Sequence, residues 1–130
     1  MTHGEFGAYM VEAAESIVGR QMQGVRSISI SARIGVTEIR ARIKGAVEDL
    51  CKEDGLVIFI DMPGGTPGNL SFPLAKDMSR VEVIGGLNLY MLISAFSHRE
   101  LSLGDLIEKI IADGRKSICD IRQMFVSRVR

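Results

Sequence analysis

The residues best suited to chemistry follow an apolar run in the middle of the chain. The run Leu56–Ile60 ends on Asp61, and a glycine-rich turn then leads to Thr66 and Pro67. A short, partly β-branched run of this kind is typical of a strand buried on both faces of a parallel sheet. Thr66 fits the N-cap of a following helix, and Pro67 fits its first residue, where the missing N–H costs nothing.

This order of residues predicts a ligand site at the carboxyl end of the strand, where open α/β sheets bind their ligands. Free N–H groups and the dipole of the helix would favour an anion there. Asp61 would repel a bare phosphate, so its carboxylate better fits a group that orients a hydrogen-bonding or cationic partner, such as a histidine. Asp61 as a simple turn cap, and Gly64 and Gly65 as turn formers only, remain alternatives.

The remaining patterns predict alternating helices and strands. Residues 25–31 alternate like a strand with one polar face, which favours a sheet edge. Residues 116–130 allow either a strand or a helix. The other expected elements are a helix over Phe6–Val18 closed by Gly19, a helix from an N-cap at Thr37 to Leu50, a helix from Thr66 towards Met78, a strand over Val81–Ile84, and helices over Leu87–Phe96 and Ser102–Ala112. This alternation predicts a layered α/β fold with a mostly parallel sheet.

Length and composition bound the class of protein. At 130 residues the chain is expected to form a single domain over residues 1–130, and its 46% apolar content fits a globular protein. Sixteen basic residues balance sixteen acidic ones, which argues against binding to nucleic acid or an anionic membrane surface. Cys51 and Cys119 are isolated, as in a reduced cytosolic protein. No membrane-length apolar segment or signal-peptide pattern occurs, so a cytoplasmic location is expected.

Three segments together resemble one known family. They are Thr2-His3-Gly4 before an amphipathic helix, residues 61–69 (Asp-Met-Pro-Gly-Gly-Thr-Pro-Gly-Asn) after a buried strand, and residues 83–92 (Val-Ile-Gly-Gly-Leu-Asn-Leu-Tyr-Met-Leu). In this order they resemble the IIA component of the mannose-type phosphotransferase system, over nearly the whole chain. The resemblance implies a three-layer, doubly wound, mostly parallel sheet of the flavodoxin-like kind.

The resemblance also implies a phosphocarrier enzyme. His3 would accept a phosphoryl group from the phosphocarrier protein HPr and pass it to a IIB component, which serves a membrane sugar permease or a regulatory role. Asp61 would hydrogen-bond the other imidazole nitrogen, Thr66 would lie near the phosphate, and the N–H groups around Gly64 and Gly65 would hold its oxygens. The family uses no metal or cofactor for this step, and its members form homodimers that exchange a C-terminal strand.

The chemistry of imidazole agrees with these roles. A neutral imidazole is a good nucleophile, and a phosphorylated one is a good leaving group. A carboxylate on one nitrogen fixes the tautomer and supports the charge that develops on the ring. Phosphoryl transfer then depends mainly on positioning and charge stabilisation, which a helix N-terminus and a hydroxyl supply.

One departure from the family concerns its first strand. Family members begin with a buried strand that leads directly into Thr-His-Gly, whereas here Met1 immediately precedes Thr2. Either the start of the chain lies upstream, or the protein lacks the family's first strand. Without that strand a slot would lie open beside Leu56–Ile60, unless residues 118–129 or a second subunit fill it. The alternative function is a non-catalytic interaction module of the same fold, inactive because this strand is absent. Contact between His3 and Asp61 distinguishes the two functions.

Overall fold

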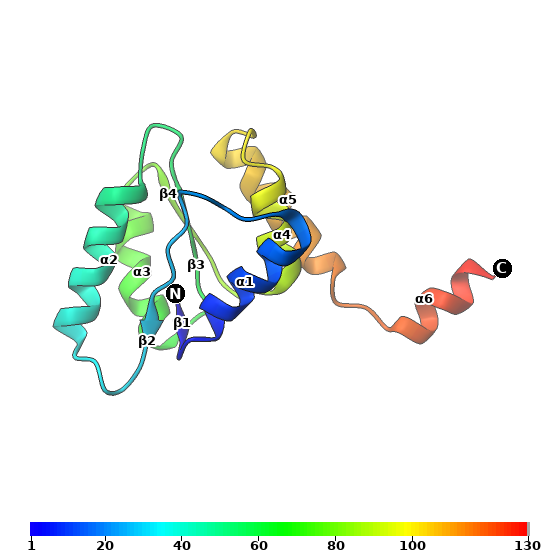
Figure 1. Cartoon of the computed structure of the whole chain (residues 1–130), viewed down its shortest axis with the longest axis horizontal. Coiled ribbons are helices and arrows are strands. Elements are labelled where there is room, and N and C mark those ends of the chain that lie inside the picture. Colours follow the sequence, from blue (N-terminus) through cyan, green and yellow to red (C-terminus); the bar gives the residue numbers. More distant parts are fainter. Residues whose placement is uncertain (130) are drawn as a thin grey trace.

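The computed structural model describes residues 1–129, in which short parallel strands alternate with helices (Figure 1). In chain order the elements are β1 (Thr2–His3), α1 (Phe6–Val18), β2 (Ser29–Ile30), α2 (Val36–Leu50), β3 (Leu56–Phe59), α3 (Gly65–Asp77), β4 (Val81–Ile84), α4 (Leu89–Ser97), α5 (Leu103–Lys116) and α6 (Ile121–Arg128). The expected α/β class is confirmed.

The strands form two separate parallel pairs. In one pair Thr2 of β1 lies opposite Ser29 of β2, and in the other Leu56 of β3 lies opposite Val81 of β4. The Met1 ammonium group links the two pairs by donating a hydrogen bond of 2.8 Å to the carbonyl of Phe59. The backbone N–H of His3 also donates one, of 3.0 Å, to Asp61 just after β3. Within residues 1–129 no strand pairs with both β2 and β3.

Helices cover the strands from two sides (Figure 1). Buried residues of α2, β2, β3 and β4 form one apolar cluster, against which Leu70 and Leu74 of α3 also pack. A second cluster joins Ile84 of β4 to α4 and α5, and α1 packs against α4. Within residues 1–129 every helix is too short or too polar to cross a lipid bilayer. The two clusters hold β3 and β4 between the helical layers.

Several predicted boundaries were wrong. The second helix begins at Val36 with Gly35 as its N-cap, rather than after a cap at Thr37. The strand predicted over residues 25–31 is reduced to Ser29–Ile30, because only this part has a partner, β1. The ambiguous C-terminal segment is helical in its described part: α6 projects away from the body of the molecule, so it does not fill the slot beside β3 (Figure 1).

Candidate functional site

A histidine–carboxylate pair lies where β1 and β3 end. The Nδ1 atom of His3 lies 2.7 Å from Oδ2 of Asp61, although the two residues are 58 positions apart in the chain. The backbone N–H of His3 donates a second hydrogen bond, of 3.0 Å, to the same oxygen. The His3 side chain is 48% exposed, whereas that of Asp61 is only 11% exposed. The carboxylate of Asp61 therefore binds the Nδ1 side of the ring, and the His3 side chain stays half-exposed to solvent.

Asp61 is held in its charged form by hydrogen bonds. Burial alone would raise the pKa of Asp61, but three donors outweigh it and hold the pKa below its ordinary value. These donors are the backbone N–H and the ring of His3 and the backbone N–H of Met62, which reaches Oδ1 at 3.0 Å. A charged Asp61 accepts a hydrogen bond from Nδ1, so the tautomer with its proton on Nδ1 is favoured. The lone pair of His3 is then on Nε2.

Thr2 positions His3 from the other side, and sequence analysis missed this role. Its side chain is buried, and its Oγ1 accepts a hydrogen bond from the N–H of Gly7 and donates one to the carbonyl of Gly4, each 3.1 Å long. A Cβ at Gly7 would lie only 2.7 Å from Thr2 Oγ1, so the start of α1 needs glycine at this point. The available signal was weak, because a threonine five residues before a glycine fits no periodic pattern.

The N-terminus of α3 faces the open edge of the His3 ring. A Cβ at Gly65 would lie 3.5 Å from His3 Nε2, and Gly65 has a φ of +69°, which favours glycine. The prediction that Thr66 is the N-cap and Pro67 the first helical residue was wrong, because the helix begins at Gly65 with Gly64 as its N-cap. Pro67 still lies in the first turn, where its missing N–H costs no helical bond.

Thr66 is therefore a first-turn residue, and it is half-buried. Within residues 1–129 its hydroxyl makes no hydrogen bond. The N–H groups of Gly65 and Thr66 belong to the first turn, where the helix itself offers them no acceptor. Together with the dipole, they can stabilise negative charge beside Nε2. The structure thus brings four of the predicted site residues, His3, Asp61, Gly65 and Thr66, to one edge of the sheet, with Gly64 as the helix cap.

Taken together, the fold and this site define a layered α/β domain that carries a histidine–carboxylate pair beside a helix N-terminus. The family model described as the PTS system fructose IIA component, EIIA-man, matches residues 1–111. The chain belongs to this family. Membership implies a phosphocarrier role in the general sense, because EIIA components of the phosphotransferase system are phosphotransferases.

Individual relatives agree with this assignment. The chain is 26% identical over 116 residues to a protein of Bacillus subtilis (strain 168) named "PTS system fructose-specific EIIA component", covering 88% of this chain and 79% of that relative. It is 24% identical to the "PTS system mannose-specific EIIAB component" of Escherichia coli (strain K12), covering 90% of this chain but only 36% of that relative's length.

Solved structures support the fold. The phosphotransferase system component EIIA from Streptococcus agalactiae is similar with a TM-score of 0.83 and 28% identity, over 94% of each chain. The mannose/sorbose-specific IIA subunit from Enterococcus faecalis also has a TM-score of 0.83, covering 93% of this chain and 90% of that one, but its 22% identity supports the fold alone. The resemblance seen in the sequence is confirmed.

Proposed function

We propose that this protein carries a phosphoryl group on Nε2 of His3. The observation that carries the proposal is the 2.7 Å contact between Nδ1 and Asp61, which leaves Nε2 of the half-exposed His3 side chain beside the N-terminus of α3. This contact is the feature expected of the catalytic form and not of an inactive interaction module. Asp61 acts as the orienting carboxylate, and Gly64, Gly65 and Thr66 surround the phosphoryl oxygens.

The transfer balances without a further reactant. The Nε2 lone pair of His3 attacks the phosphorus of a phosphohistidine on HPr, so that a P–N bond forms on His3 as the P–N bond to the donor breaks. The proton on Nδ1 stays in its hydrogen bond to Asp61, whose charge stabilises the positive ring. In the second transfer a nucleophile of a IIB component attacks the phosphorus, and the P–N bond to His3 breaks. No step requires a metal ion or a cofactor.

The family supplies the remaining parts of the proposal. The donor is HPr, the acceptor is a IIB component, and a membrane sugar permease is served indirectly, for sugar uptake or regulation. The protein acts in the cytoplasm as a homodimer. The sheet is of the doubly wound, three-layer, flavodoxin-like kind.

The test is phosphorylation by phosphoenolpyruvate, enzyme I and HPr, followed by mass mapping of the modified residue. We expect one acid-labile phosphate on His3 and none in the His3→Ala variant. The chain contains one other histidine, His98, whose Nδ1 lies 2.8 Å from the carbonyl of Ser94, and His98→Ala is the matched control that keeps full labelling. Labelling that survives in His3→Ala would mean that another residue is the acceptor. A folded parent that is never labelled would favour the interaction module instead.

A further inference from the structure

The third motif of the sequence, residues 83–92, has no part in the site described so far. It covers the end of β4, a turn that contains Gly85 and Gly86, and the start of α4. None of its residues was predicted to belong to the site. Two backbone hydrogen bonds nevertheless join it to the end of the strand that leads into Asp61.

These bonds hold Ile60, the residue directly before Asp61. The N–H of Ile60 donates to the carbonyl of Ile84 at 2.9 Å, and the carbonyl of Ile60 accepts from the N–H of Leu87 at 3.1 Å. The Ile60 carbonyl and the Asp61 N–H belong to one planar peptide unit. The bond from Leu87 therefore fixes the plane from which the Asp61 side chain departs. A rotation of this plane would move the carboxylate relative to Nδ1 of His3.

The turn that follows Asp61 also lies against this motif. A Cβ at Gly85 would lie 3.4 Å from Cδ of Pro63, so a side chain larger than that of alanine at position 85 would separate the two turns. The backbone on both sides of Asp61 therefore rests on residues 85–87. A displacement of these residues would be passed on to the carboxylate.

Asn88 holds residues 85–87 at their other end. It is the N-cap of α4, and its Oδ1 accepts a hydrogen bond of 3.1 Å from the N–H of Met91. Its Nδ2 donates a bond of 3.3 Å to the carbonyl of Gly114, near the end of α5. The two bonds use both ends of one side-chain amide, so Asn88 joins the turn to two helices at once. Because Asn88 directly follows Leu87, these bonds also hold the N–H that binds Ile60.

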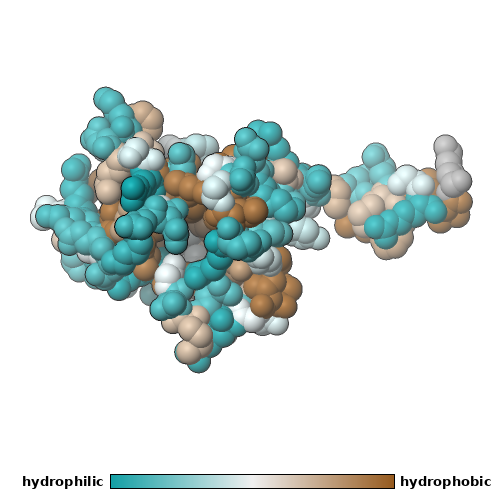
Figure 2. Space-filling model, turned by 90° about the horizontal axis from the view of Figure 1, so that it is seen from above, coloured by the Kyte–Doolittle hydropathy of each residue, from teal (hydrophilic) through white to brown (hydrophobic). Residues whose placement is uncertain are grey.

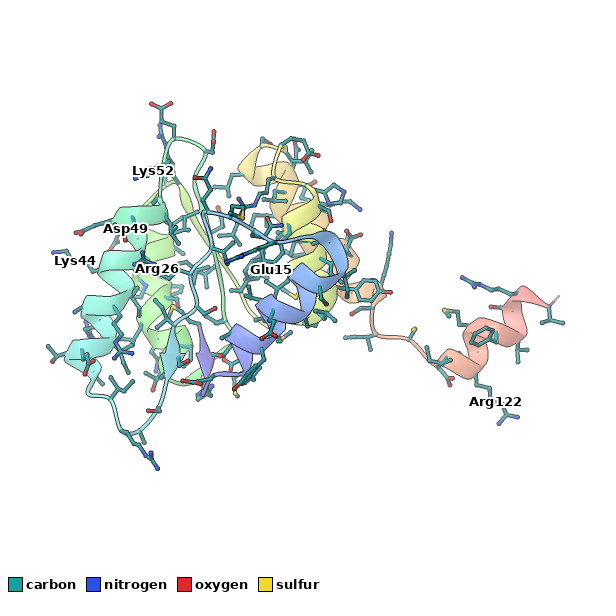
Figure 3. All side chains as sticks on the ribbon, in the orientation of Figure 1. Glu15, Arg26, Lys44, Asp49, Lys52 and Arg122 are labelled. Atoms are coloured by element: carbon teal, nitrogen blue, oxygen red, sulfur yellow. The ribbon has the colours of Figure 1, made fainter. Side chains whose placement is uncertain are left out.

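The two helices that Asn88 joins are closely packed. They share an apolar cluster that includes Ile110, which is fully buried. A Cβ at Gly114 would lie only 2.6 Å from Cγ of Met91, so glycine is needed for this close approach of α5 to α4. By contrast, α6 stands clear of the body of the molecule (Figure 2), and its residue Arg122 points away from both helices (Figure 3). The support for the turn therefore comes from α4 and α5.

We infer that Asn88 is a positioning residue for phosphoryl transfer, acting on Asp61 through the N–H of Leu87 and the carbonyl of Ile60. In the described part of the chain Asn88 makes no hydrogen bond to His3 or Asp61, so it has no part in the chemistry itself. Without its side chain the turn loses its side-chain hydrogen bonds to α4 and α5, and the carboxylate of Asp61 takes up a wider range of positions. The inference rests on the proposed function of His3.

The test compares Asn88→Ala with Ser102→Ala, because each variant removes one helix cap. Ser102 is the N-cap of α5, and its Oγ accepts a hydrogen bond of 3.3 Å from the N–H of Asp105. It lies about 18 Å along the helix from Gly114, at 1.5 Å per residue. We expect the thermal midpoint to fall by about 3–6 °C in both variants. Phosphoryl transfer from phosphorylated HPr should slow by about fivefold or more in Asn88→Ala alone, because transfer depends on exact placement of the reacting groups.

The second readout is the NMR spectrum of the ring nitrogens of His3 in the unphosphorylated protein. Their chemical shifts report the share of the tautomer that has its proton on Nδ1, which the bond to Asp61 favours. We expect this share to fall in Asn88→Ala and to keep its parent value in Ser102→Ala. A loss of helix stability alone would not produce this difference between the two variants.

Three results would overturn the inference. They are a transfer rate within about twofold of the parent in folded Asn88→Ala, equal slowing by Ser102→Ala, and parent ring-nitrogen shifts in an Asn88→Ala variant that transfers slowly. If Asn88→Ala does not fold, Asn88→Gly takes its place, because glycine is well tolerated at an N-cap. A parent chain that is never phosphorylated would refute the proposed function, whereas the NMR comparison would still decide whether Asn88 positions the histidine–carboxylate pair.

Discussion

Replacing Asp61 with asparagine keeps the size of the side chain but removes the negative charge that faces His3. Oδ2 of Asp61 accepts hydrogen bonds from both the backbone N–H and Nδ1 of His3, at 3.0 and 2.7 Å. An amide oxygen can still accept one of these bonds, so the histidine should stay close to its present position. The change therefore acts mainly on the charge that stabilises a positive, phosphorylated ring.

The magnitude follows from the strength of these bonds. A hydrogen bond to a charged group contributes about 1.5–3 kcal/mol, against about 0.5–1.5 kcal/mol for a neutral pair. The Nδ1 bond gains most as charge develops on the ring, so the loss in Asp61→Asn should be about 1–3 kcal/mol. This corresponds to phosphoryl transfer that is roughly 5- to 150-fold slower. The site of phosphorylation should remain His3.

The assay is rapid-quench measurement of phosphoryl transfer from phosphorylated HPr to the protein. Asp113→Asn is the matched control, because Asp113 is also a carboxylate whose pKa is lowered, by hydrogen bonds from Ser94 and Lys109, but it lies on α5. The control should react at the parent rate. An Asp61→Asn rate within twofold of the parent, with the fold intact, would refute the role given to Asp61.

Three further predictions concern the surroundings of the pair. Gly65→Ala should lower the free energy of unfolding by about 1 kcal/mol, because alanine is strained at a φ of +69°. It should also slow phosphoryl transfer, because the new Cβ would lie 3.5 Å from the reacting nitrogen of His3. Denaturant titration measures the first effect, and the same quench assay measures the second. Gly7→Ala should displace Thr2 and destabilise the protein. Gly45→Ala, in open space on α2, should instead stabilise it by up to about 1 kcal/mol. A higher thermal midpoint for Gly7→Ala than for Gly45→Ala would contradict the packing described at Gly7. Because the folded pKa of Asp61 is lowered, its stabilising effect is fully present above its unfolded pKa of about 4 and is lost as pH falls through the folded value; the stability gap between the parent and Asp61→Asn should shrink below about pH 4.

The sequence was informative where a local pattern and a tertiary contact agreed. Asp61 follows a strand that is buried between helical layers, and its position at the strand end was predicted from the apolar run alone. Its contact with His3 was expected only from the family resemblance, because no local rule links residues 58 positions apart.

The errors arose where tertiary context overrides local preference. Thr66-Pro67 is a good helix start by propensity, but the helix begins two residues earlier. The chain enters it through Gly64 and Gly65, which have positive φ, and Gly65 leaves space for the His3 ring. The alternating segment 25–31 has strand propensity throughout, yet hydrogen-bonded pairing is limited to the length of β1. Strand formation requires a partner, and propensity does not supply it.

The position of His3 depends on contacts within a few residues of the chain end. A residue so close to a terminus is ordinarily poorly held. Here the Met1 ammonium is bonded to Phe59, the Thr2 hydroxyl is bonded to Gly4 and Gly7, and the His3 N–H is bonded to Asp61. These hydrogen bonds therefore hold His3 against Asp61, although His3 lies so early in the chain.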